Sequence, residues 1–102
     1  MIHVIATISA KPGMRDQVLA FFKANVSDVR AEKGCVEYGA VIDAEEAPGF
    51  QKRLGPDTMV VFERWESMDA LADHANSPHV VRYRANIKPL LVSSTVNFLS
   101  SV

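Results

Sequence analysis

The sequence contains a single cysteine, Cys35, and no long apolar run. One cysteine cannot form a disulfide within the chain, which is typical of proteins that fold in a reducing compartment. No apolar stretch approaches the ~18 residues of a membrane-spanning helix, so we expect no membrane partner. The opening MIHVIATISA has no charged segment ahead of its apolar residues and predicts a strand, not a signal peptide. Together these features favour a cytoplasmic protein.

A strong excess of one charge is also missing. The net charge is −1 and the lysines and arginines are dispersed along the chain, so the basic patch of a nucleic-acid-binding protein is not predicted. His74 and His79 lie five positions apart with Pro78 between them, a spacing that does not place two metal ligands on one helical face. We therefore expect neither nucleic acid nor metal to bind.

The sequence does contain regular strand and helix patterns, in one domain that spans residues 1–102. Apolar spacings of three and four predict a helix from Met14 that ends at Gly34, and two shorter helices that follow the caps Ser67 and Ser77. Alternation of apolar residues predicts strands at 2–10, 35–43, 60–65 and 92–100. This order predicts an α+β fold of the ferredoxin-like split βαβ type, an antiparallel sheet with helices on one face.

The strand at 60–65 carries bulky residues on both faces. Val61 and Trp65 lie on one face, and Val60 and Phe62 lie on the other. A monomer with helices on one face would leave the second apolar face in water. We therefore expect a homodimer in which the sheets of two copies pack face to face. The segment EEAPGFQKRLGPDT at 45–58 predicts a long loop, which either closes over a pocket or supports the dimer.

The stretch VVFERWESMDALADHANSPHVVRY, residues 60–83, concentrates the side chains that could carry chemistry. Imidazole titrates near neutrality, so the side chain of His74 could take a proton from a phenolic hydroxyl and return it; the alternative is a histidine at the rim of an apolar helix face. Glu63 shares a face with Trp65, where a carboxylate needs a partner or a raised pKa. It would orient a histidine, hold a substrate hydroxyl, or form a structural ion pair across the dimer interface with Arg64, Arg82 or Arg84 of either copy.

Three further residues are candidates for substrate binding. Trp65 could stack on a flat aromatic substrate through its large apolar face, or serve as a core or interface anchor. Tyr83 and His79 lie on the helix that follows Ser77, and either could line a pocket or bind a substrate oxygen. The alternatives are helix packing for Tyr83 and an exposed surface position for His79.

The chain resembles the antibiotic biosynthesis monooxygenase family over nearly its whole length. The resemblance is carried by VIATISAKPG, EKGCVEY and FQKRLGPDT, and above all by residues 60–83, with Glu-x-Trp, a histidine nine residues after the tryptophan, and Ser-Pro-His. It implies a dimeric α+β barrel. Within the family the chain looks most like the small bacterial quinol monooxygenases, which oxidise hydroquinones with O₂ and use no metal, flavin or haem.

Three positions depart from other branches of the family. Val61 stands where anthrone-oxidising members have asparagine, four residues before the tryptophan. His74 stands where haem-degrading relatives have an aromatic residue, and Arg84 stands where they have histidine. These departures argue against a haem or anthrone substrate.

The resemblance therefore implies a cofactor-independent monooxygenase or oxidase that acts on a quinol or related electron-rich phenol with O₂. Its catalytic residues would be His74 and Glu63, and its small aromatic substrate would contact Trp65, Tyr83 and His79. One alternative is an isomerase of a small phosphorylated signal molecule, which needs an arginine or lysine subsite and has the candidates Arg82, Arg84 and Lys88. The other is a non-catalytic dimeric binding protein, with no cavity beside its paired Glu63 and His74.

Overall fold

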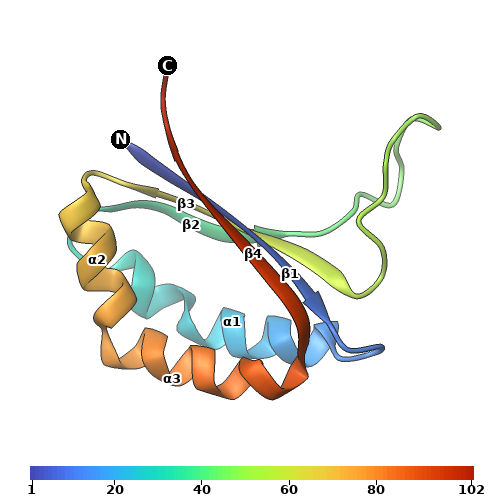
Figure 1. Ribbon diagram of the computed structural model, residues 1–102, viewed down its shortest axis with the longest axis horizontal. Coiled ribbons are helices and arrows are strands. Elements are labelled where there is room, and N and C mark those ends of the chain that lie inside the picture. Colours follow the sequence, from blue (N-terminus) through green and yellow to red (C-terminus); the bar gives the residue numbers. More distant parts are fainter.

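The computed structural model describes all 102 residues and has a four-stranded antiparallel sheet with helices on one face (Figure 1). The order of elements is β1 (Ile2–Ala10), α1 (Arg15–Arg30), β2 (Cys35–Val41), β3 (Thr58–Trp65), α2 (Met68–Asn76), α3 (Pro78–Ile87), a 3-10 turn (Lys88–Leu90) and β4 (Leu91–Ser100). The strands lie in the order β2-β3-β1-β4, which confirms the ferredoxin-like split βαβ arrangement. None of the helices combines the length and the apolar character that a membrane crossing needs.

The helix ends follow local hydrogen bonds. The predicted end of α1 at Gly34 was wrong by about one turn, because the N–H of Glu32 bonds back three residues to Val29 and tightens the chain after Arg30. Gly34 has φ +85° and forms the left-handed end of the turn that follows. The hydroxyl of Ser67 accepts from the N–H of Ala70 at 3.1 Å, as an N-cap should.

Ser77 occupies the N-cap position of α3, but its side chain does not cap that helix. Its hydroxyl instead donates to the carbonyl oxygen of His74 at 2.8 Å. That carbonyl belongs to the last turn of α2, where backbone acceptors lack helical partners. Ser77 therefore stabilises the sharp bend that joins the two short helices through this hydrogen bond to α2.

An arm of residues 42–57 connects β2 and β3 and projects from the end of the sheet far from α2 (Figure 1). The strand β2 ends at Val41, two residues earlier than predicted, because Asp43 turns into this arm. Its carboxylate accepts from the N–H groups of Leu54 and Gly55, both at 3.0 Å. These two backbone donors hold the pKa of Asp43 below its usual range.

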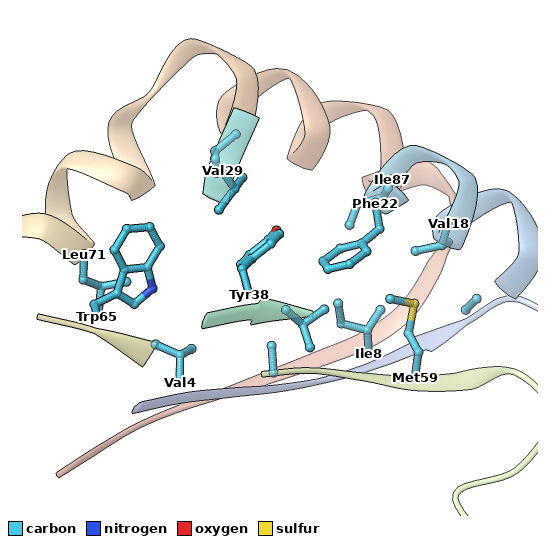
Figure 2. Packing of buried hydrophobic residues seen from close by; sticks show 14 residues of the cluster. Val4, Ile8, Val18, Phe22, Val29, Tyr38, Met59, Trp65, Leu71 and Ile87 are labelled. Carbon is cyan, nitrogen blue, oxygen red and sulfur yellow. The ribbon is translucent and has the colours of Figure 1, made fainter. Parts of the chain in front are cut away.

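The hydrophobic core lies between the sheet and the helices (Figure 2). Trp65, at the end of β3, is completely buried. Further along the layer, the rings of Phe22 and Tyr38 stack with their centroids 5.0 Å apart. Truncating a buried aromatic residue of this kind typically costs about 3–5 kcal/mol of stability. The core thus fixes α1 and α2 against the β2–β3 half of the sheet.

The sheet is wider than the helix layer that covers it. On β1, Val4, Ala6 and Ile8 face the helices and are buried. Their partners on β4 are Phe98, Val96 and Ser94, which lie on the same face of the sheet but remain exposed. The helix-facing side of β4 is therefore uncovered.

Gly34 sets how closely the turn after α1 approaches α2. A Cβ atom on this residue would lie 2.5 Å from the Cβ of Ala70. The carbonyl of Gly34 also accepts from the N–H of Glu66 at 2.9 Å. This close approach keeps Glu32, two residues earlier, beside α2.

We predict that Gly34→Ala destabilises the protein more than Gly13→Ala. Both glycines have positive φ, which costs an alanine about 1–2 kcal/mol. Only Gly34 also meets a side chain, and overpacking of this kind adds about 1–3 kcal/mol. The measurement is urea unfolding of both variants and the wild type. Equal losses of unfolding free energy would show that the contact with Ala70 relaxes at no cost.

Candidate functional site

A cavity of about 630 Å³ lies between the helix pair α2–α3 and the helix-facing side of the sheet, next to the uncovered strand β4. It exists because no helix covers the inner face of β4. Its walls are mostly apolar and include Val4, Ala6, Val61, Leu71, Val96 and Phe98. Its polar lining side chains, Ser94 apart, are Tyr38, Glu63, His74, Tyr83, Arg84 and Lys88. A large apolar cavity with a few convergent polar groups is the usual form of a small-molecule site.

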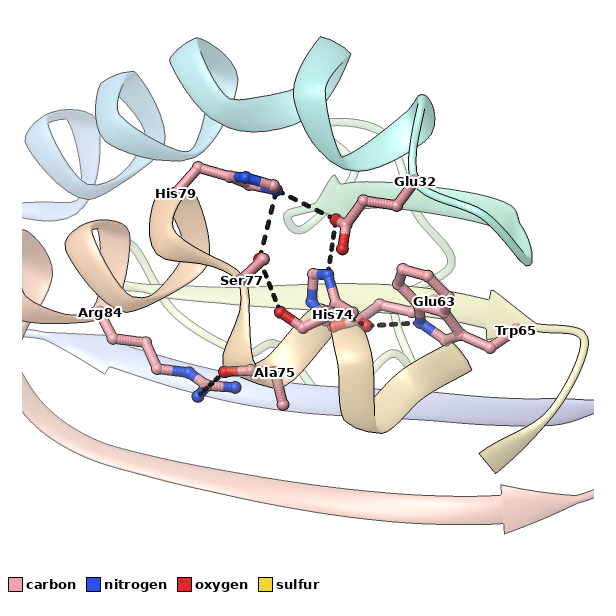
Figure 3. A network of polar contacts seen from close by, with 8 residues as sticks. All are labelled: Glu32, Glu63, Trp65, His74, Ala75, Ser77, His79 and Arg84. Atoms are coloured by element: carbon pink, nitrogen blue, oxygen red, sulfur yellow. Dashed lines mark hydrogen bonds and ion pairs between the residues drawn. The ribbon is translucent and has the colours of Figure 1, made fainter. Parts of the chain in front are cut away.

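Glu63 and His74 both line this cavity, and their side chains lie next to each other (Figure 3). Glu63 is 9% exposed and His74 is 4% exposed. The indole N–H of Trp65 donates to Oε1 of Glu63 at 2.8 Å, and Nε2 of His74 lies 3.7 Å from the same oxygen. The rings of Trp65 and His74 pack with their centroids 4.5 Å apart.

Glu32 holds the other nitrogen of His74. Its Oε2 lies 2.9 Å from Nδ1 of His74. An ionised carboxylate can only accept a hydrogen bond, so Nδ1 carries the proton in this pair. In the neutral imidazole Nε2 then has the free lone pair. His74 therefore presents its basic nitrogen on the side of Glu63 and the cavity.

Burial raises the pKa of Glu63, because a carboxylate in an apolar layer loses its hydration. The hydrogen bond from Trp65 and the positive charges of His74 and Arg84 act in the opposite direction. Burial is the largest of these influences, so the pKa of Glu63 remains above its usual value. Carboxyl groups of this kind are common at functional sites.

Tyr83 lines the cavity, and its hydroxyl oxygen is buried without a hydrogen-bond partner. Burial raises the pKa of Tyr83 to about 12, so the group stays protonated at neutral pH. A buried hydroxyl without a partner is uncommon in folded proteins. It is a donor that no acceptor of the chain uses.

The structure brings together three of the five residues predicted for the site and places two behind it. Glu63, His74 and Tyr83 line the cavity, whereas Trp65 and His79 do not. Trp65 is completely buried, and its indole N–H donates a hydrogen bond to the carboxylate of Glu63. His79 is half-buried, with its Nε2 3.2 Å from Oε2 of Glu32. In the single chain both residues support the site from outside the cavity wall, and their direct contact with substrate stays a prediction.

The expected ion pair of Glu63 with an arginine is also not formed within the chain. Arg64 points to the opposite face of the sheet, where its Nε donates to Glu37 at 2.8 Å. Arg84 donates instead to the carbonyl oxygen of Ala75 at 3.2 Å. Glu63 is paired by Trp65 and His74 from its own layer.

The family model for antibiotic biosynthesis monooxygenase matches residues 1–86. The chain belongs to this family. The probable quinol monooxygenase YgiN of Escherichia coli K12, as that protein is named, is 34% identical over 101 residues, which are 97% of this chain and 96% of YgiN. The solved structure of Rv0793 from Mycobacterium tuberculosis has a TM-score of 0.82 at 31% identity and covers 99% of this chain and 94% of that one. PA3566 from Pseudomonas aeruginosa has a TM-score of 0.81 at 27% identity, with 99% and 93% covered.

In this family member, sequence reasoning missed Glu32 as a site residue. Glu32 begins the EKGCVEY segment, but it lies in the turn after α1, where no helical or strand pattern indicates a direction. Its contact with His74 spans 42 positions of the chain. The one available signal was an acidic residue in a segment already singled out by the resemblance.

We predict that Glu63→Gln changes the pH dependence of stability. The folded pKa of Glu63 is raised above its usual 4.5, so the folded state binds this proton more tightly than the unfolded state does. The stability that this proton provides is present at low pH and is lost as the pH rises through the folded pKa. Glutamine has no such loss, so the stability of the variant relative to wild type should increase between about pH 4 and about pH 8.

The measurement is urea unfolding at both pH values. Glu37→Gln is the matched control, since it removes a half-exposed carboxylate from the neighbouring strand. If Glu63→Gln changes the free energy of unfolding by the same amount at both pH values, the raised pKa of Glu63 is contradicted.

Proposed function

We propose that this family member is a cofactor-independent monooxygenase or oxidase of a quinol or related electron-rich phenol, with O₂ as the second substrate. The observation that carries the proposal is a basic nitrogen at the wall of an apolar cavity. Nε2 of His74 has this position because Glu32 engages Nδ1. The printed name of YgiN supports the same substrate class.

The first step is removal of a phenolic proton. A phenol has a pKa of about 10, so a hydroquinone is neutral at physiological pH and a poor electron donor. In the proposed mechanism Nε2 of His74 takes the proton from one hydroxyl as a general base. Glu32 and Glu63, 2.9 Å and 3.7 Å from the two ring nitrogens, stabilise the imidazolium that forms. The free hydroxyl of Tyr83 donates to a substrate oxygen.

The second step is electron transfer to O₂. The quinol anion passes one electron to O₂ and forms a semiquinone and superoxide. Transfer of a second electron, with both quinol protons, gives the quinone and hydrogen peroxide. Alternatively, superoxide adds to a ring carbon and the hydroperoxide loses water, so that quinol and O₂ give a hydroxyquinone and water. In both routes the proton held by His74 returns to the reduced oxygen.

The cavity also favours this proposal over a non-catalytic protein in which Glu63 and His74 are only a structural pair. That alternative requires Glu63 and His74 to be paired without a cavity beside them. Both residues line a cavity, and Nε2 of His74 makes no hydrogen bond within the chain, its distance to Glu63 being 3.7 Å. An imidazole nitrogen left unbonded in this way is suited to a ligand hydroxyl.

We predict that reduced naphthoquinones and benzoquinones cause oxygen uptake above their autoxidation rate, in buffer containing a metal chelator. His74→Ala should lower the enzyme-dependent rate by about a hundredfold or more, since general bases typically contribute that much. Oxygen-electrode rates at several enzyme concentrations separate catalysis from autoxidation.

The matched control is His3→Ala. His3 lies on the opposite face of the sheet and bonds to Ser101 at 2.7 Å, so its loss should leave the rate unchanged. If the wild type takes up oxygen no faster than autoxidation with every quinol of the panel, the proposal is overturned. The phosphorylated-signal isomerase and the binding protein would then be tested by ligands that raise the melting temperature.

We also propose that two copies pair through the sheet face that the helices leave open. Ile5, Val60 and Phe62 form the apolar centre of this face, and each is only partly buried in the single chain. The ring of Phe62 lies over Gly39, where a Cβ would come within 2.6 Å of it. A continuous apolar patch on a small domain is typical of an interaction surface.

We predict that the wild type has twice the single-chain mass of 11.2 kDa in sedimentation equilibrium, and that Phe62→Glu shifts it to the single-chain mass. A buried unpaired carboxylate would be strongly unfavourable at the centre of such an interface. Phe98→Glu is the control, because Phe98 is 61% exposed but lies on the helix-facing side. A wild type of single-chain mass would contradict face-to-face pairing.

A further inference from the structure

Two cations line the cavity without an acidic partner. Arg84 and Lys88 lie four residues apart on α3 and its extension, on one side of the helix. Neither forms an ion pair with any carboxylate of the chain. Glu63 is the one carboxylate in the cavity wall, and Trp65 and His74 already engage it. The cavity wall therefore carries unpaired positive charge at a distance from His74, the proposed general base.

The guanidinium of Arg84 is held in place beside the site. Its Nη1 donates to the carbonyl oxygen of Ala75, at the end of the helix that carries His74 (Figure 3). This is its only hydrogen bond within the chain, so its other N–H groups have no protein acceptor. Its charge lowers the pKa of Glu63 and Tyr83, which places it within electrostatic reach of the cavity. A fixed guanidinium with free donors is well suited to a carboxylate.

The positions of the two ends of the cavity follow from strand register. Glu63 is opposite Val4 on β1, whereas Ser94, which also lines the cavity, is opposite Ile8. Four residues along a strand correspond to roughly 13 Å. Lys88 lies just before β4, at the end of the cavity near Ile8. Arg84 precedes it by about one helical turn, which brings it roughly 6 Å closer to His74.

We propose that Arg84 and Lys88 form a carboxylate-binding subsite, and that the preferred substrate is a quinol whose ring system carries an anionic carboxylate. This inference rests on the proposed oxidase function. The apolar walls hold the ring, His74 faces a ring hydroxyl, and the carboxylate lies toward α3. A ring system of one or two fused rings fits the separation between base and cations.

The test compares two quinols that differ by one group, 1,4-dihydroxy-2-naphthoate and 1,4-naphthohydroquinone. The carboxylate changes the intrinsic reactivity of the ring, so the informative quantity is the ratio of the two kcat/KM values in each variant. Arg84→Met and Lys88→Met should each lower the ratio about tenfold, as expected for loss of a hydrogen bond to a charged group. Both residues are exposed, so the variants should fold normally.

Arg82→Met is the matched control. Arg82 is exposed on the same helix but does not line the cavity, so its removal should leave the ratio at the wild-type value. A ratio that stays unchanged in the Arg84 and Lys88 variants, or that falls equally with Arg82→Met, would overturn the subsite.

Anaerobic calorimetry separates this inference from the oxidase proposal. Under these conditions no oxidation takes place, and the affinity for 1,4-dihydroxy-2-naphthoate should fall in the Arg84 and Lys88 variants alone. If this loss of affinity is seen in calorimetry but the aerobic assay shows no oxygen uptake, the result would support the subsite and contradict the oxidase. Oxygen uptake with an unchanged substrate ratio would support the oxidase and contradict the subsite.

Discussion

The buried carboxylate of Glu63 is the constraint on which the site depends. A carboxylate removed from water is unfavourable by several kcal/mol unless it is paired and hydrogen-bonded. The indole N–H of Trp65 provides this hydrogen bond at 2.8 Å, and the imidazole of His74 lies close by, with its Nε2 3.7 Å from the same carboxylate oxygen. The helix α2 is therefore packed tightly onto the end of β3, which in turn brings His74 against Glu32.

The resulting arrangement places one imidazole between two carboxylates. Glu32 fixes the tautomer of His74, and Glu63 lies near the nitrogen that faces the cavity. Ionic interactions are stronger in such a layer than in water, because the surrounding apolar groups screen them poorly. An imidazolium formed by proton uptake would be stabilised without any rearrangement of the protein. This is the property that a base for cofactor-free chemistry requires.

The cavity has a separate origin, in the unequal widths of the two layers. Four strands form the sheet, and the helices cover its β2, β3 and β1 portion. The inner face of β4 contributes Val96 and Phe98 to the cavity instead of to the core. The arm at residues 42–57 projects from the end of the sheet far from α2 (Figure 1) and contributes no cavity wall. Access to the site is thus set by β4 and α3.

The sequence by itself determined the order of elements, because strand and helix periodicities are local and each hydrophobic pattern matched its element. It also determined which face of β3 carries Glu63, since neighbouring strand residues alternate strictly. Only the tertiary structure decided that Trp65 and His79 lie outside the cavity wall, that Glu32 contacts His74, and that Arg84 and Lys88 line the cavity. These relations join residues that are distant in the chain or on different elements, and packing between layers, which leaves no periodic trace in sequence, establishes them.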